Sequence, residues 1–585
     1  MLPPAESAAP LRSGRAVLAL GVVGVLLAAA DTYVIVLALP DIMVGVGLDI
    51  DELQRAAPLV SMFLLGYVVV LPLAGRISDV AGRLPVLIGS LLIFAAGSLL
   101  TAGAHGLAEA VTGRFLQGAG GGALVPVTLA MVADLWPPER RGLPLGVVGA
   151  VQELGAVLGP LYGAVVIAVA DWRAIFWINL AAGLVLAAGA RIAGRSPGAS
   201  RSRDNRGSGD VPGAVLAAVA VAAGALAIIR PPAVSGSVTW GGVLVPLVPG
   251  HGWSSPVALG AIALTVGFVA RELTATTPWI NLRRAPALMR AADLPGAILL
   301  GAALGAVVLT FAVADPQIEL MAPAGPWLLA GAAAMLATFA WWQRRSPTPL
   351  VPADAVRARP AWGALLVSIF VGAALVAVLV DVPVLARTVL PGADQLDAAL
   401  VLLRFLVALP VGALLGGWLL RRTPPAPVAA AGMAVAAGGI TIMAGWGVGS
   451  LAGIADDLVL AAAGFGFGLA VAPINAALLA ATPRATHGVA SALVVTARMV
   501  GMLAGLSALT AIGLRRLYAE QARIESPAIT CPQSPTDCPP YDDAVREAIV
   551  AQLQATFTGA AVCAGIAAIT AAVLLRSPDR MAVRR

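Results

Sequence analysis

The sequence predicts an all-α membrane protein that crosses a lipid bilayer many times, and three observations carry this prediction. Of the 585 residues, 59% are hydrophobic and 12% are charged, whereas soluble domains average about 25% charged residues. The mean hydropathy is +0.91. Apolar segments of about 18–28 residues, long enough to span a bilayer as helices, recur along the chain. No loop is long enough for a folded catalytic domain, so we do not expect an enzyme.

The positive charge has a simpler explanation than a nucleic-acid partner. All 37 basic residues are arginine, and the formal net charge is +6. Arginines at helix ends set the orientation of a membrane protein, because cytoplasmic loops carry the excess of positive charge. They form no continuous basic stripe with interleaved aromatic residues, so we expect no nucleic-acid binding. Their placement predicts that both termini lie in the cytoplasm.

Two sets of six apolar segments predict two six-helix bundles. The first set predicts an N-terminal bundle over residues 1–191, with segments near 16–39, 57–74, 84–103, 108–133, 142–169 and 172–191. The second predicts a C-terminal bundle over residues 361–585, with segments near 361–389, 396–419, 425–446, 457–481, 487–514 and 556–576. Short echoes between the halves, such as Asp31 with Asp381, indicate a duplicated transporter architecture.

Residues 192–360 predict a cytoplasmic linker followed by an insert of two helical hairpins. The linker, 195–210, is rich in Arg, Ser and Gly, which is typical of flexible chain. Beyond it, "DVPGAVLAAV" (210–219) resembles "DLPGAILLGA" (293–302), and each stretch begins an apolar segment that is followed by a second one. A four-helix insert gives about sixteen crossings in total. The alternative is that one weak segment lies on the membrane surface, which leaves fourteen or fifteen crossings.

Three motifs in the N-terminal half of the chain are typical of helices that shift relative to one another. In "GRISDVAGR" (75–83), glycines permit a tight turn and Asp79 can interact with a helix N-terminus. Such a loop can clasp one conformation of a two-state transporter. "RFLQGAGGGALVPVTLA" (114–130) sets an arginine beside a glycine run that permits close packing. "QELGAVLGPLYG" (152–163) repeats glycine every fourth residue, which permits close helix contact, and its proline bends the helix. The residues singled out for gating are Gly75, Asp79, Gly82 and Arg83, and those of the third motif are Gly155, Gly159, Pro160 and Gly163.

These motifs resemble those of the major facilitator superfamily, and the third resembles the antiporter motif of its proton-driven exporters. With "DTYVIV", "DWRAIFWIN" and "HGVASALVVTARMVGML", the resemblance narrows to the fourteen-helix drug:proton antiporters, and within them to the mycobacterial triacylglyceride exporters. It covers nearly all of both bundles but fails at the duplicated insert and weakens over 515–555. It implies the major facilitator fold and proton-coupled export of lipid.

Acidic residues inside apolar segments are the candidate proton carriers. A carboxylate within the bilayer is costly unless it is paired, hydrated or protonated. Burial favours the protonated form and a neighbouring arginine favours the ionised form, so alternating access can load and release a proton. The resemblance implies coupling roles for Asp31, Glu153 and Arg498, and a role in proton transfer for Arg114. The residues alone add Asp381 and Arg404. The alternative is that one such acid forms a static buried salt bridge.

The last loop holds two further expectations. Cys531 and Cys538 flank a polar stretch predicted to lie outside the membrane, where a disulfide can form. If helix continues from 487 to about 524, two helices protrude outside the membrane as an extension near 515–555. The alternative is a packed extracellular loop.

The sequence therefore predicts a proton-coupled exporter of triacylglycerides or related apolar lipids in the plasma (inner) membrane, working by alternating access. The alternative is a multidrug:proton antiporter for amphiphilic cations. The expected partners are the membrane, protons, a lipid or hydrophobic substrate and, from the resemblance, a periplasmic lipid-carrying lipoprotein. Spacing for a P-loop, a catalytic triad or a zinc site is missing, so we expect no cofactor or metal and a proton gradient as the driving force.

Overall fold

The architecture is helical throughout the part of the chain that the structure describes. In this computed structural model that part comprises residues 8–49, 53–194, 211–230, 234, 236–237, 240–248, 254–275, 283, 285–312, 324–390, 392, 395–534 and 538–576, which include no strand. Thirteen helices in it are long and apolar enough to cross a membrane. The all-α membrane fold is therefore confirmed, whereas the total of sixteen crossings stays a prediction.

Six helices form the N-terminal bundle around the buried helix α4. Glycines on α4 make this possible, because a Cβ at Gly118 would lie 1.9 Å from the carbonyl oxygen of Phe63 on α2. The bundle places α4 against α2, α3 and α1. The helices are α1 (Ala8–Gly45), α2 (Leu53–Ala81), α3 (Arg83–Ala102), α4 (Leu107–Leu135), α5 (Gly142–Val169) and α6 (Arg173–Ala193).

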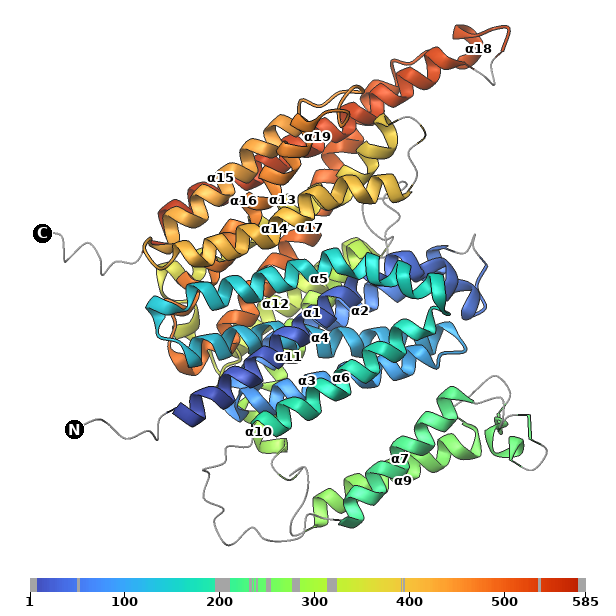
Figure 1. The fold of residues 1–585 in the computed structure, drawn as a ribbon, viewed down its shortest axis with the longest axis vertical. Helices are drawn as coiled ribbons and strands as arrows, with labels where there is room; N and C mark the ends of the chain where they lie inside the picture. The colour runs from blue at the N-terminus through green and yellow to red at the C-terminus, as the bar shows by residue number, and fades with distance from the viewer. Residues whose placement is uncertain are drawn as a thin grey trace, which may run out of the picture.

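Six further helices form the C-terminal bundle beside it (Figure 1). The start of α1 and the end of α19 lie at the same end of the molecule, here called the terminal end, and the opposite end is called the distal end. The two bundles pack together along two seams, α2 with α17 and α5 with α14. The helices are α13 (Arg359–Val389), α14 (Gln395–Leu419), α15 (Pro425–Met443), α16 (Ile454–Ala480), α17 (His487–Gln521) and α19 (Pro539–Leu574).

A helical extension projects beyond the rest of the C-terminal bundle at the distal end. Helix α17 has 35 residues and α19 has 36. At 1.5 Å per residue each is longer than about 50 Å, against a hydrocarbon core of about 30 Å. The short helix α18 (Pro527–Thr530) lies at the tip (Figure 1), and a disulfide joins Cys531 to Cys538 beside it.

The insert consists of two hairpins that are placed differently. The first hairpin, α7 (Val211–Ile229) and α9 (Pro256–Thr274), lies beside the N-terminal bundle for most of its length without packing on it, and α7 contacts the end of α3 (Figure 1). The second hairpin, α11 (Leu294–Ala312) and α12 (Gly325–Gln343), follows the short helix α10 (Ala285–Ala291) and packs on the bundles. The linker over 195–210 lies outside the described residues.

Candidate functional site

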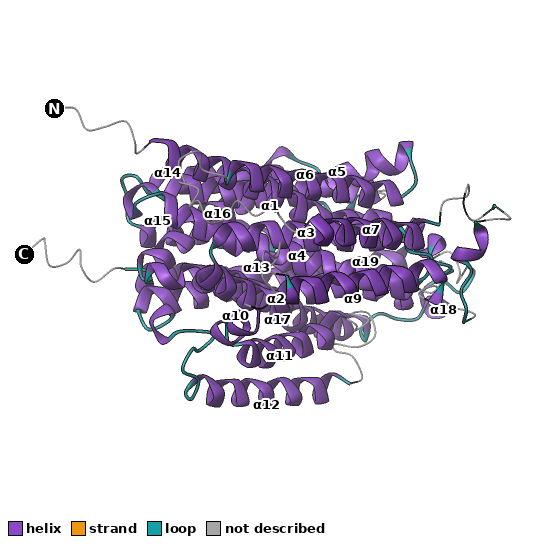
Figure 2. Ribbon diagram, turned by 90° about the horizontal axis from the view of Figure 1, so that it is seen from below, coloured by secondary structure: helices purple, strands orange, loops and turns teal. Residues whose placement is uncertain are grey.

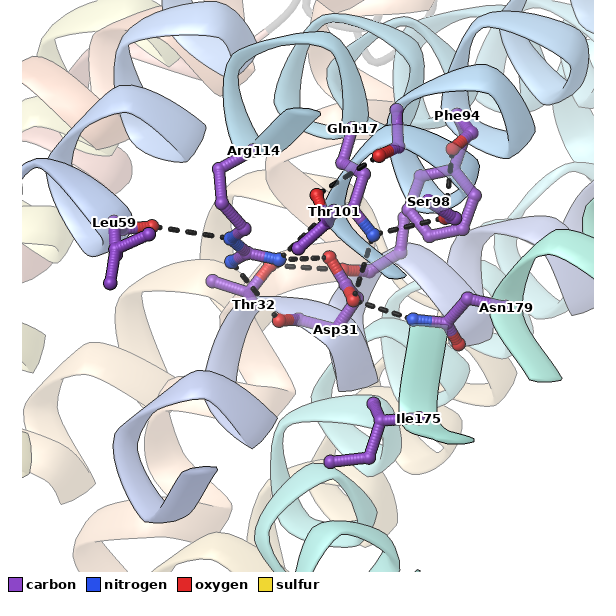
Figure 3. Close-up of polar contacts among 12 residues, drawn as sticks. Asp31, Thr32, Leu59, Phe94, Ser98, Thr101, Arg114, Gln117, Ile175 and Asn179 are labelled. Atoms are coloured by element: carbon purple, nitrogen blue, oxygen red, sulfur yellow. Dashed lines mark hydrogen bonds and ion pairs between the residues drawn. The ribbon is translucent and has the colours of Figure 1, made fainter. Parts of the chain in front are cut away.

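Asp31 lies at the centre of a hydrogen-bond network inside the N-terminal bundle (Figure 3). Its carboxylate accepts hydrogen bonds from Arg114 Nη1 at 2.7 Å, Asn179 Nδ2 at 2.6 Å and Gln117 Nε2 at 3.3 Å. Gln117 Nε2 also donates to Ser98 Oγ at 3.0 Å. The network therefore joins helices α1, α3, α4 and α6. The side chains of Asp31 and Arg114 are both 0% exposed, so this is a fully buried ion pair.

The Arg114 guanidinium has partners beyond the carboxylate. Its Nε donates to the backbone carbonyl of Leu59 on α2 at 3.2 Å. It also lies over the ring of Phe63, 4.4 Å from the centroid, and 6.0 Å from that of Phe176 on α6. Buried arginine needs such hydrogen bonds and cation–π contacts because it has lost its hydration. Helices of the N-terminal bundle alone therefore hold the Asp31–Arg114 pair.

A second ion pair spans the two bundles. Glu153 on α5 and Arg498 on α17 approach to 3.5 Å between Oε1 and Nη1, and both side chains are largely buried. Tyr33 and Tyr67 line the same cavity as Glu153. Because the partners belong to different bundles, any relative movement of the bundles at this level changes their separation. This pair can therefore couple the charge of one carboxyl group to the relative position of the two bundles.

Two small cavities lie beside this inter-bundle pair. One of about 60 Å³ is lined by Glu153 and one of about 40 Å³ by Arg498. Val125 and Gln152 line both. A cavity needs roughly 10–15 Å³ to hold one water, so each has room for a few waters. Neither has room for a lipid in this conformation.

The glycine motif over residues 152–163 packs α5 against the segment of α1 that carries Asp31. A Cβ at Gly159 would lie 2.4 Å from the carbonyl oxygen of Ala30, and one at Gly155 would lie 2.6 Å from the Cβ of Ala29. Gly163 similarly faces Val34. Such close approach is possible only without a side chain. These glycines thus set the position of the Asp31 backbone relative to α5, on which Pro160 and Glu153 also lie.

The remaining predicted coupling residues are not brought into these pairs. Asp381 on α13 is half-buried and makes no hydrogen bond or ion pair with other described residues. Arg404 on α14 pairs with Asp457 on α16, and both side chains are more than a third exposed. Asp457 lies in the first turn of α16 and neutralises the charge of Arg404 there. We therefore withdraw Arg404 from the candidate coupling residues. The structure assigns Arg114 to Asp31 and Arg498 to Glu153.

Asp79 clasps the two bundles together at the terminal end of the α2/α17 seam. Its carboxylate accepts hydrogen bonds from the backbone N–H groups of Gly488 at 2.8 Å and Val489 at 2.9 Å. These are free donors at the N-terminus of α17, where the partial positive charge of the helix favours a carboxylate. Arg83 pairs with Asp79 at 2.5 Å and with Asp134 on α4 at 3.0 Å. The clasp therefore ties α2 to the start of α17 at this end.

Glycines permit the clasp to form. A Cβ at Gly75 would lie 2.5 Å from the carbonyl oxygen of Gly488, so the helices could not approach as they do. Gly82, between α2 and α3, has φ +94°, a conformation that favours glycine. The four gating residues predicted from the sequence thus lie together in the structure.

We expect Asp79→Asn to weaken the clasp, because the neutral amide loses the charge that binds the α17 N-terminus and Arg83. A loss of about 1–3 kcal/mol shifts the equilibrium between the conformations with a closed and an open terminal end by roughly 5–150-fold toward the open one. Ala492 contacts the clasp region and is fully buried. The labelling rate of Ala492→Cys by a water-soluble maleimide should therefore rise. Asp134→Asn, which removes only a contact to Arg83, is the control and should raise it less. Equal rates in all three backgrounds would contradict the clasp.

Sequence reasoning did not assign roles to Gln117 and Asn179, although both complete the Asp31 network. The available signal was a polar amide within each apolar segment, in "RFLQGAGG" and "DWRAIFWIN". Such a residue usually faces the inside of a helical bundle. Which acid it meets depends on how four helices assemble. Among the described residues, no group of three or more His, Cys, Asp or Glu side chains could hold a metal ion.

Comparison with known proteins decides the family. Residues 21–343, more than half of the chain, match the model of the Major Facilitator Superfamily. The chain belongs to the Major Facilitator Superfamily. As a member of this superfamily it is a multi-pass membrane transporter, and the resemblance inferred from the motifs is confirmed.

Curated relatives within the superfamily cover most of the chain. A protein of Mycolicibacterium hassiacum named triacylglyceride transporter is 37% identical over 542 residues, covering 91% of this chain and 84% of the relative. A triacylglyceride transporter of Mycobacteroides abscessus is 35% identical over 519 residues, covering 87% and 84%.

Solved structures agree on the fold. A human organic anion transporter superposes with a TM-score of 0.55 at 14% identity, covering 95% of this chain and 99% of its own. A proton:xylose symporter of the same superfamily gives a TM-score of 0.52 at 14% identity, covering 95% and 94%. At this identity the likeness concerns the major facilitator fold alone.

Proposed function

We propose that this major facilitator transporter exports triacylglycerides or related apolar lipids across the plasma membrane and is driven by a proton gradient. The cargo assignment is supported by relatives that are 35–37% identical over about nine-tenths of the chain and are named triacylglyceride transporters. Proton coupling is supported by the Glu153–Arg498 pair between the bundles. The transporter carries no catalytic site in this proposal.

The coupling mechanism follows from where each carboxyl group lies. Protonation of Glu153 removes the charge that attracts Arg498, so the bundles can separate at that level. Deprotonation restores the attraction. Asp31 can hold a second proton, at the cost of its charge attraction to Arg114. Asp381, on the C-terminal helix that echoes α1, has no competing arginine contact and is the third candidate.

The proposed orientation places the terminal end in the cytoplasm. Pairs of arginines stand at the terminal end of the helices, as cytoplasmic loops require; they are Arg140 and Arg141, Arg344 and Arg345, and Arg421 and Arg422. With the Asp79 clasp closed, the conformation described above is then closed toward the cytoplasm. In export, protons enter from outside and leave to the cytoplasm while lipid moves outward.

The distal extension would then stand in the periplasm. Helices α17 and α19 continue beyond the rest of the bundle, and the disulfide closes the loop that joins them at the tip. A lipid with no water-soluble part must be received at once by another apolar surface. We therefore include a periplasmic lipid-carrying lipoprotein as the proposed partner.

Transport in proteoliposomes under an imposed pH gradient tests this function. Wild type should move labelled triacylglyceride only with the gradient, and Glu153→Gln should lose the dependence on the gradient because the side chain can no longer titrate. Asp457→Asn is the matched control: it neutralises an acid that pairs with Arg404 near the surface, and it should transport like wild type. Movement of ethidium without triacylglyceride would identify a multidrug:proton antiporter and reject the lipid assignment.

A further inference from the structure

The second hairpin of the insert lies on one of the two seams between the bundles. Helix α11 packs along α2 and also contacts α17, the two helices that form this seam. Helix α12 lies outside α11, on the side away from the bundles (Figure 2). Most of α11 is buried: Ala303 is 1% exposed and Val308 is 0% exposed. The hairpin therefore separates the α2/α17 seam from whatever surrounds the protein.

Close packing fixes α11 to α2. A Cβ at Gly301 would lie 2.8 Å from Cγ1 of Val69, and one at Gly305 would lie 3.1 Å from Cδ1 of Leu65. Gly301 and Gly305 are four residues apart, as are Leu65 and Val69, so the contacts lie along one face of each helix. Helix α11 thus packs closely on the N-terminal bundle, and its Leu300 and Leu304 join the same apolar core as the bundles.

A buried carboxylate holds the base of the hairpin. Asp293 is 2% exposed and precedes α11. It accepts hydrogen bonds from Trp342 Nε1 at 2.7 Å, Gln343 Nε2 at 2.8 Å and the backbone N–H of Leu350 at 2.8 Å. These contacts join the start of α11, the end of α12 and the segment that leads into α13. The hairpin is therefore held at its base as well as along α11.

The first hairpin shows that such docking does not follow from the duplication alone. When the repeats are aligned on Asp210 and Asp293, Ala218 and Ala222 stand where the second repeat has Gly301 and Gly305. The window of α9 that could span a membrane is only 6% buried. Helix α7 reaches the bundle where Ile228 meets Gly103 at the end of α3. Alanine at both positions adds methyl groups that would hinder an approach as close as that of α11 to α2.

The other seam has no such cover. Among the described elements, no insert helix packs along α5 or α14. Apolar side chains of the two helices that form this seam are exposed, among them Leu161 of α5 at 48% and Val407 of α14 at 52%. In a bilayer these side chains face lipid. The two seams, although equivalent in the duplicated architecture, therefore differ in their access to the bilayer.

We propose that the α11/α12 hairpin is a fixed wall that closes the α2/α17 seam toward the bilayer, so that apolar cargo passes between the bilayer and the transporter centre through the α5/α14 seam. This inference rests on the proposed lipid cargo. It requires that the hairpin stays on α2 throughout the transport cycle and that the edge of the α5/α14 seam is sensitive to charge.

A disulfide between the hairpin and α2 tests the first requirement. The Cβ positions of Gly301 and Val69 are 3.8 Å apart, the mean Cβ separation in disulfides being about 3.8 Å. Oxidised Val69→Cys/Gly301→Cys, in a Cys563→Ala background, should transport labelled triacylglyceride like wild type. Gly149→Cys/Ala413→Cys, with Cβ positions also 3.8 Å apart, links α5 to α14 and should stop transport when oxidised. Loss of transport in the first variant that a reductant restores would overturn the proposal. Wild type with and without reductant controls for the native disulfide.

An arginine placed on α5 and, separately, on α12 tests the second requirement, that the α5/α14 seam is sensitive to charge. Leu161→Arg should lower triacylglyceride transport by about tenfold or more, because apolar cargo would have to pass a charge in the bilayer. Leu336→Arg, on the outer helix α12 at a similar exposure of 44%, is the matched control and should keep near wild-type transport. Equal rates for the two variants would overturn the proposal. If wild type itself moves no triacylglyceride, the cargo assignment fails and the inference falls with it, which the wild-type arm reveals directly.

Discussion

Asp31→Asn is expected to abolish gradient-driven transport and to destabilise the folded protein. The substitution leaves the Arg114 guanidinium buried without its counter-charge, and removing one partner of a buried ion pair costs about 3–5 kcal/mol. Neighbouring Gln117 and Asn179 would retain their amides but would face a neutral group that cannot titrate. Thermal unfolding in detergent and lipid transport under a pH gradient measure the two effects separately.

A second substitution separates a coupling role from a merely structural one. In Asp31→Asn/Arg114→Gln both charges are gone, so we expect much of the lost thermal stability to return. Replacing a buried ion pair completely is often neutral or even stabilising. Transport should stay absent, because no titratable group is left at the centre of the network. Recovery of transport together with stability would show that the pair is a static salt bridge.

Gly159→Ala is expected to have the second large effect, through packing. The new Cβ would lie 2.4 Å from the carbonyl oxygen of Ala30, and backbone of α1 would have to move away from α5. Overpacking of this kind typically costs about 1–3 kcal/mol. Because Asp31 follows Ala30, the shift would also disturb its bond to Arg114. Thermal stability and transport should therefore fall together.

Gly89→Ala supplies the matched control for this substitution. Gly89 lies within α3, and a Cβ there would meet nothing within 4 Å. Alanine stabilises a helix interior relative to glycine by about 1 kcal/mol, so this variant should be unchanged or more stable. If Gly159→Ala is as stable as Gly89→Ala, the close contact between α1 and α5 is not important to the fold.

Much of the helical layout could be predicted because each segment carries its own signal. The apolar segment near 142–169 coincides with α5, and the segments near 16–39 and 487–514 correspond to the longer helices α1 and α17. The extra length was harder to see, because helix ends outside the apolar core are not marked by hydrophobicity. The continuation toward residue 521 was the exception, since helix-forming residues continue there without an interruption.

Partners in the site were predicted less well than the residues themselves. Asp31, Glu153 and Asp381 stand out because acids are rare in apolar segments. Their partners lie far away in the sequence: Arg114 is 83 residues from Asp31, and Arg498 is 345 from Glu153. Arg404 and Arg498 both lie inside apolar segments, yet Arg404 pairs with Asp457. Hydrophobicity does not distinguish the two arginines, because the difference lies in which neighbouring helix each one faces.

The residue pattern was thus sufficient for the membrane class, the helices, the motifs and the family resemblance, since each depends on local composition or on short fixed spacings. Assembly determined the rest: the pairing of Asp31 with Arg114, the link between Glu153 and Arg498, and the different fates of two similar hairpins. The physical reason is distance along the chain. An ion pair or a close helix contact forms between residues on the facing sides of two helices. Which helices face each other is decided only when segments distant in sequence pack together, as those carrying Gly301 and Val69 do.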